Sequence, residues 1–221
     1  MATPDLERLG GQARVLGAVV TGLHLVARSV LTSSVSAVEL ARSPGWMLLN
    51  MLGASGAILL LAGTAALLRQ LVRGGGGLLA LIGLALVGWF WLFSGVFLDL
   101  HAALLMPWLA KEAPWMLTGR DIPSTLLVVL GSALLALCSG AVLLAIPFLR
   151  GRLQPMWVGI ALLAGAALSL AGDLVARDGP SSSLALNLFS NLGPILVAGV
   201  LGSLGVRLSL PLQPNGRGEL P

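Results

Sequence analysis

The chain has 221 residues, of which 57% are hydrophobic and 10% are charged. This composition excludes an ordinary soluble domain, in which about 25% of residues are charged. The net charge of +4 does not indicate nucleic-acid binding, because the basic residues lie in short segments between long hydrophobic runs. The only cysteine, Cys138, lies within one of these runs, so an intramolecular disulfide is excluded.

Six hydrophobic segments are long enough to cross a membrane, because a hydrocarbon core of about 30 Å needs about 20 helical residues. In chain order they are Ala13–Leu31, Trp46–Leu68, Leu78–Leu100, Thr125–Leu149, Trp157–Leu174 and Leu184–Val206. The polar stretches between them are too short for an independent core. We therefore expect one all-α domain over residues 1–209, an integral membrane bundle of about six transmembrane helices. Residues 210–221 are rich in Pro and Gly and are predicted to be a disordered tail.

The first segment contains two ionisable residues, His24 and Arg28. An alternative interpretation is a cleaved signal peptide, because the small residues at 35–37 fit a cleavage site. Asp5 and Glu7 before the segment, and the ionisable residues within it, argue against this interpretation. We expect the first helix to be retained.

The distribution of basic residues predicts the orientation. The N-terminal segment, the second and fourth loops and the C-terminal segment contain Arg8, Arg14, Arg69, Arg73, Arg150, Arg152, Arg207 and Arg217. The other three loops contain Arg28, Arg42, Lys111, Arg120 and Arg177, together with Glu39, Asp99, Glu112, Asp121, Asp173 and Asp178. Because cytoplasmic loops retain Lys and Arg, both termini are predicted to be cytoplasmic. The expected location is the cell membrane, and the composition favours a bacterial inner membrane.

Two of the predicted outer loops have a loosely helical pattern, over Ser36–Arg42 and Met106–Leu117. They are expected to form short interfacial helices on the membrane surface, with Pro107 and Pro114 breaking the second.

Polar side chains within the helices are concentrated in the predicted outer half, and the inner half is almost purely apolar. The outer set is His24, Arg28, Asn50, Asp99, His101, Asp173, Asn187 and Asn191. Ionisable groups inside a membrane face the bundle interior or water, so a polar cavity open to the outside is one interpretation. The other is that Arg28, Asp99, His101 and Asp173 lie near enough to the interface to reach water. His24 and Asn191 lie deeper and are the better cavity candidates.

Helical spacing limits which of these residues act together. His24 and Arg28 share a helix face, as do Asp173 with Arg177 and Asn187 with Asn191. Asp99 and His101 are about 200° apart around a helix and do not point at one centre. Pro194 is expected to kink the sixth helix or to free a carbonyl group near Asn191.

No residue pattern indicates a catalytic, cofactor or metal site. The run from Gly53 to Ile58 resembles the Gly-x-Ser-Gly turn of rhomboid intramembrane proteases. Its serine, Ser55, is predicted to pair in depth with Trp91, well below His101, the only downstream histidine. The small residues of this run are therefore expected to serve close helix packing.

The stretch 148–159, FLRGRLQPMWVG, and the nearby Gly165 resemble the fourth loop and fifth helix of a large group of bacterial six-helix membrane proteins classed as a domain of unknown function. The opening run RVLG at 14–17 and the spacing of the helices resemble that group too. The resemblance implies the topology and carries no activity.

Three functional classes follow from this sequence. The scarcity of polar groups favours a non-catalytic accessory or helix-packing component of the membrane. The alternative is a small transporter or binding protein for an apolar or weakly polar solute, with an outward-facing polar cavity. Its candidate lining residues are His24, Arg28, Asn50, Asp99, His101, Asn187 and Asn191. A membrane enzyme is the third class. Expected partners are the lipid bilayer, a membrane protein or a second copy of the chain, and not nucleic acid.

Overall fold

The computed structural model describes residues 3–118, 124–151, 153, 155–178 and 183–209, and every regular element in these ranges is a helix. Within them, six spans are long and apolar enough to cross a membrane: Asp5–Ser34, Pro44–Arg73, Gly77–Glu112, Val128–Leu149, Met156–Val175 and Leu184–Val206. The predicted all-α bundle of six transmembrane helices is confirmed. The predicted tail over 210–221 lies outside the described residues, as do Arg120, Asp121, Arg152 and Arg217.

The first three spans and their connections contain eight helices. These are α1 (Thr3–Ser34), α2 (Ala37–Arg42), α3 (Pro44–Ala62), α4 (Thr64–Arg73), α5 (Gly77–Phe90), the π-helix η1 (Trp91–Phe97), α6 (Leu98–Glu112) and α7 (Trp115–Thr118). The last three spans are single helices, α8 (Ser124–Leu149), α9 (Met156–Asp178) and α10 (Leu184–Ser209).

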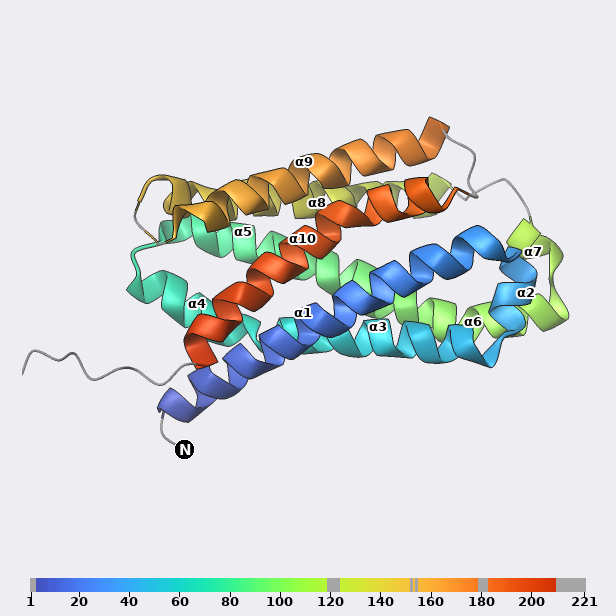
Figure 1. Cartoon of the computed structure of the whole chain (residues 1–221), viewed down its shortest axis with the longest axis horizontal. Helices are drawn as coiled ribbons and strands as arrows, with labels where there is room; N and C mark the ends of the chain where they lie inside the picture. Colours follow the sequence, from blue (N-terminus) through green and yellow to red (C-terminus); the bar gives the residue numbers. More distant parts are fainter. Residues whose placement is uncertain (1–2, 119–123, 152, 154, 179–182, 210–221) are drawn as a thin grey trace, which may run out of the picture.

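The six spans form a closed ring in which neighbours in sequence are neighbours in space (Figure 1). The first span, α1, packs between α3 and α10, and α9 packs between α10 and α8. The third span completes the ring, because α5 packs against α8 whereas η1 and α6 pack against α3.

Both chain ends described in the structure lie at the same end of the bundle (Figure 1). There α10 approaches α1 so closely that a Cβ atom on Gly205 would lie 2.6 Å from the Gly11 carbonyl oxygen. We call this end the terminal end and the opposite one the distal end. An even number of spans returns the chain to its starting side, as predicted.

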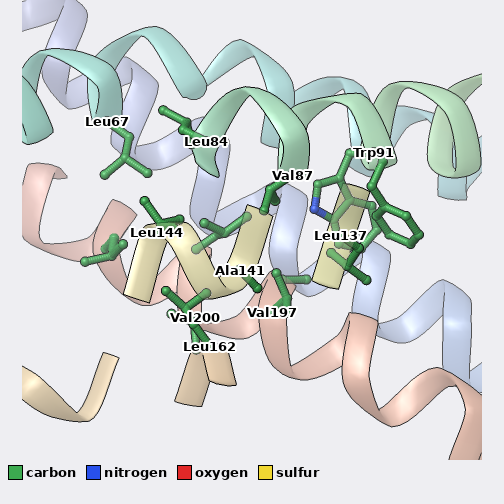
Figure 2. Close-up of a cluster of buried hydrophobic side chains, with 14 of the residues drawn as sticks. Leu67, Leu84, Val87, Trp91, Leu137, Ala141, Leu144, Leu162, Val197 and Val200 are labelled. Carbon is green, nitrogen blue, oxygen red and sulfur yellow. The ribbon is translucent and has the colours of Figure 1, made fainter. Parts of the chain in front are cut away.

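An apolar cluster fills the interior of the ring toward the terminal end. Its buried side chains come from α3, α4, α5, η1, α8, α9 and α10, and Leu67, Leu84, Val87, Leu144 and Val200 are among them. Figure 2 shows these residues packed together, with Trp91 at one end of the cluster. Toward the terminal end, the cavity between Leu67, Phe148 and Leu204 has a volume of only about 30 Å³.

The second and third spans differ from the uninterrupted helices predicted for them. The second span is two helices that meet at Gly63, where the side chain of Arg14 crosses it. The third span passes through the π-helix and continues to Glu112, well beyond its predicted end at Leu100. Asp99 therefore lies inside a helix and not at its end.

At the distal end, the expected helix over Ser36–Arg42 is present as α2. Ser36 caps it, because the Ser36 hydroxyl accepts from the Glu39 N–H and donates to the Glu39 carboxylate. The Arg42 guanidinium donates to the Ala110 carbonyl oxygen at 2.9 and 3.2 Å and so holds α2 against α6.

The helix expected over Met106–Leu117 differs from its prediction. Pro107 lies within α6 and does not break it, because one proline removes only one helical hydrogen bond and α6 is supported by α2 and α3. Pro114 does separate α6 from α7.

Candidate functional site

Three glycines of the second span, Gly53 and Gly56 in α3 and Gly63 directly after it, allow α1 to approach closely. A Cβ atom on Gly53 would lie 2.6 Å from His24 Cε1, and one on Gly56 would lie 2.6 Å from Thr21 Oγ1. At Gly63 the added atom would meet the side chain of Arg14. The prediction that these small residues serve close packing is confirmed, and the residues they accommodate are polar.

A buried group of three ionisable side chains joins α1 to α6. The Arg28 guanidinium Nη1 lies 2.9 Å from Asp99 Oδ1, and His24 Nε2 lies 3.3 Å from Asp99 Oδ2. The His24 contact is close enough for an ion pair but is not an aligned hydrogen bond. The Asp99 and His24 side chains are almost completely buried, whereas 35% of the Arg28 side chain is exposed. We call these three residues the charged triad.

The hydrogen positions of His24 follow from its neighbours. Its Nδ1 atom lies 3.0 Å from the Leu49 carbonyl oxygen, and a carbonyl oxygen only accepts, so Nδ1 carries a hydrogen. Its Nε2 atom faces a carboxylate oxygen of Asp99.

The charged triad lines a cavity of about 140 Å³ between four of the spans. Its polar lining consists of Thr21, His24 and Arg28 from α1, Trp91 and Ser94 from η1, Asp99 from α6 and Asn191 from α10. Gly53 and Pro194 lie in the wall as well. Because one water occupies about 30 Å³ in the liquid, the cavity has room for roughly four or five waters or one small solute.

Three buried polar atoms of the lining residues have no hydrogen-bond partner among the described residues: Thr21 Oγ1, His24 Nε2 and Trp91 Nε1. Thr21 Oγ1 lies against Gly56 of α3, and His24 Nε2 lies beside Asp99. An unpaired buried polar group costs about 1 to 3 kcal/mol, so burying these groups lowers the stability of the bundle.

Hydrogen bonds between α1 and α10 support one side of the cavity. Asn191 Nδ2 donates to Ser29 Oγ and to the Asn187 carbonyl oxygen, each at 2.9 Å. Ser29 Oγ lies 2.8 Å from the Leu25 carbonyl oxygen and 3.2 Å from that of Asn187. Pro194 lies within α10, as expected, and cannot donate to the carbonyl group one turn before it, near Asn191.

Of the seven candidate cavity residues, the structure brings four together: His24, Arg28, Asp99 and Asn191. Asn50 is buried beside the cavity without lining it, and its Nδ2 donates to the Trp46 carbonyl oxygen at 2.8 Å. Asn187 lies in the α1–α10 contact, and its side chain reaches Thr32 at 3.4 Å. His101 is exposed and points away from Asp99, in agreement with the spacing argument.

The interpretation that Asp99 reaches water at the interface is wrong, because Asp99 is 3% exposed. Its burial follows from the π-helix and from the continuation of α6. In an uninterrupted α-helix, Trp91 and Asp99 would differ by about 80° around the helix axis. The π-helix contains one additional residue in its turn, and this rotates the residues after it back by about 100°. The π-helix therefore brings both residues toward one side.

Arg14 was not predicted as a bundle residue, because its position at the start of an apolar segment is typical of a loop. It lies inside α1, is only 1% exposed, and its Nε and Nη1 atoms have no partner among the described residues. The expectation that the inner half is almost purely apolar is thus wrong at this residue. The glycines at 63 and 205, which pack on the Arg14 stem, were a signal for a large buried side chain.

The structure changes the register inferred for Ser55. Gly95 meets Ala57 and Gly53 meets Asp99, so Ser55 is closer in depth to His101 than predicted. Its hydroxyl nevertheless donates to the Met51 carbonyl oxygen of its own helix at 2.9 Å, and the side chain is exposed. Within the described residues, no three His, Cys, Asp or Glu side chains gather as metal ligands would.

Comparisons with protein-family models, with curated proteins and with solved structures found no match to this chain.

Proposed function

We propose that this chain is a membrane protein that binds or transports a small polar solute in the cavity beside the charged triad. The observation that supports this function is the convergence of polar side chains from three spans on one cavity. His24 and Asn191 have separate partners, as a packing role would also give them, but both line the same cavity.

The depth of the cavity supports an outward-facing state. The apolar cluster fills the ring between the cavity and the terminal end. On the other side, Arg28 is partly exposed. With both termini in the cytoplasm, as the distribution of basic residues favours, the cavity would receive its solute from outside the cell.

An accessory or helix-packing role is the second candidate function. Two features favour it. Polar residues are scarce elsewhere in the spans, and Trp89, Phe93 and Phe97 stack in a row of which Trp89 and Phe97 are exposed. Such a row suits a neighbouring protein or lipid. An accessory role gives no reason for unpartnered polar atoms around a cavity. We therefore place solute binding first.

Water access to Ser94 tests the proposed function. In a Cys138→Ser background, Ser94→Cys places a thiol in the cavity wall, and Ser55→Cys places one on the exposed surface of α3 at similar depth. Glu112→Cys, at the distal end, is the control for an accessible thiol. Each is treated in intact cells with a small, charged methanethiosulfonate reagent.

We expect Ser94→Cys and Glu112→Cys to react and Ser55→Cys to stay unmodified, because only a water-filled site admits a charged reagent within the membrane. Reaction of Glu112→Cys alone would contradict an outward-facing cavity. The accessory role would then be the better explanation.

A further inference from the structure

We propose that the solute of this cavity is a small anion, such as nitrate, formate or another anion of a few non-hydrogen atoms. This inference rests on the proposed function and names the class of solute. Three features of the cavity carry it: the two basic side chains of the triad, the occupied oxygens of Asp99 and the hydrogen-bond donors of the lining residues.

The charged triad contains two basic side chains, His24 and Arg28, and one carboxylate, Asp99. The Arg28 guanidinium is charged, because arginine does not lose its proton in proteins, and 35% of the Arg28 side chain is exposed. A partly exposed guanidinium with no second acidic residue in the lining attracts anions.

A cation would find no free ligand in the cavity. Asp99 is the only carboxylate among the lining residues, and its two oxygens already face Arg28 and His24. A metal or ammonium ion would have to displace one of these partners and would then lie beside the guanidinium. The repulsion between two unit charges a few Å apart exceeds the gain from weak hydroxyl or amide ligands.

The polar side chains of the lining favour an acceptor as the ligand. Trp91 Nε1 only donates hydrogen bonds, and the Arg28 guanidinium carries five N–H groups and no acceptor. A ligand bound by Arg28 must therefore present oxygen atoms or another acceptor.

The size of the cavity limits the ligand. A volume of about 140 Å³ excludes a nucleotide or a lipid headgroup and admits an anion of a few heavy atoms. This chemistry departs from the apolar or weakly polar solute expected from the sequence. The departure arises because Arg28 and Asp99 lie in the cavity wall and not at the interface.

The sign of the charge that enters the cavity tests this inference. The Ser94→Cys, Cys138→Ser protein is treated with the anionic 2-sulfonatoethyl and the cationic 2-trimethylammonioethyl methanethiosulfonates. Each rate is divided by the rate of the same reagent with free 2-mercaptoethanol. We expect the corrected anion-to-cation ratio to be about tenfold or more, as one unit charge in a partly desolvated site produces. At the control site, Glu112→Cys, the ratio should be near one.

Three outcomes separate the inference from the function on which it rests. A ratio at Ser94→Cys well above the control supports the anion. A ratio at or below the control, with both reagents reacting, overturns the anion but leaves the proposed function standing. If neither reagent reacts, the cavity is closed to water and both proposals are wrong.

A charge variant provides a second measurement. Arg28→Gln in the Ser94→Cys background should lower the anion-to-cation ratio at least tenfold, whereas Arg42→Gln, which removes an arginine outside the cavity, should leave it unchanged. Equal ratios in both variants would overturn the inference. If Arg28→Gln does not fold, a protection assay replaces it. The reaction of Ser94→Cys with N-ethylmaleimide should be slower in sodium nitrate than in sodium gluconate. Equal rates in the two salts would overturn the inference.

Discussion

Asp99 lies inside a helix that crosses an apolar bundle, where an unpaired ionised group would cost at least a few kcal/mol. Arg28 and His24 compensate it from α1, and each occupies one carboxylate oxygen. Buried groups of this kind add little net stability, but the loss of one partner leaves another charge uncompensated. The triad is therefore better explained by a role in the cavity than by a role in stability.

We predict that Asp99→Asn lowers the free energy of unfolding by about 2 to 4 kcal/mol, because it leaves the Arg28 charge without its counter-charge. The double variant Asp99→Asn, Arg28→Gln should be less destabilised than the sum of the two single variants, by about 1 to 3 kcal/mol. Denaturation of the purified protein in detergent, monitored by helical circular dichroism, measures both quantities.

Glu112→Gln is the matched control, because Glu112 is exposed and pairs only with the exposed Lys111. It should change stability by less than about 0.5 kcal/mol. Additive effects of the Asp99 and Arg28 substitutions would show that the two side chains do not interact.

At the scale of helices, the site depends on how closely α1 approaches α3. A side chain at any of the three glycines of the second span would overlap a residue of α1: His24, Thr21 or Arg14. On α6 and η1 the π-helix turns Asp99 and Trp91 toward the same space. Both features concern the contact between spans, and neither is visible in the hydrophobicity of a single segment.

We predict that Gly53→Ala destabilises the bundle by about 1 to 3 kcal/mol, because the new methyl group would lie 2.6 Å from His24 Cε1 and would separate it from Asp99. Gly199→Ala is a matched change on α10, where an added Cβ atom meets nothing within 4 Å. It should stabilise the protein by about 0.5 to 1 kcal/mol, since alanine loses less backbone entropy than glycine.

Thermal unfolding of both variants in the same detergent measures whether each substitution raises or lowers the stability of the protein. A stabilising Gly53→Ala would mean that α1 and α3 separate easily, and the charged triad would then not be held at the distances found here.

At the scale of the whole molecule, a closed ring of six spans places polar side chains from three spans around a cavity in one half of its interior. The other half is mainly apolar, with Arg14 as a buried exception. The two halves of the bundle therefore differ in polarity. Which side of the membrane the cavity faces depends on the orientation of the whole chain, and the arginines at the terminal end favour the cytoplasm for that end.

We predict that a cysteine at Glu112 is labelled by a membrane-impermeant maleimide in intact cells, and that one at Arg73 is labelled only after permeabilisation. Both positions are exposed. Arg73 ends the second span at the terminal end of the bundle, and Glu112 ends the third span at the distal end. The measurement uses the Cys138→Ser background. Labelling in the reverse pattern would place the termini outside and would make the cavity face the cytoplasm.

The sequence by itself determined the number of spans, the approximate ends of the last three spans and the shared side of the two termini, because the length of an apolar helix must match the thickness of the bilayer. It also identified His24, Arg28, Asp99 and Asn191 as candidates, because polar groups in apolar helices are rare and costly. The close packing of the α3 glycines was predictable on the same local grounds.

Only the tertiary structure decided which polar groups meet. Asp99 and His101 are two residues apart, yet Asp99 is buried and His101 is exposed. Which of the two faces the interior depends on the π-helix before them, and the pattern of hydrophobic residues in this segment does not predict a π-helix. Arg14 looked like a loop residue until α3 and α10 enclosed it. A sequence determines the energy of placing each side chain in a membrane, whereas the partner that compensates a buried charge comes from another span and is fixed only by the packing of the ring.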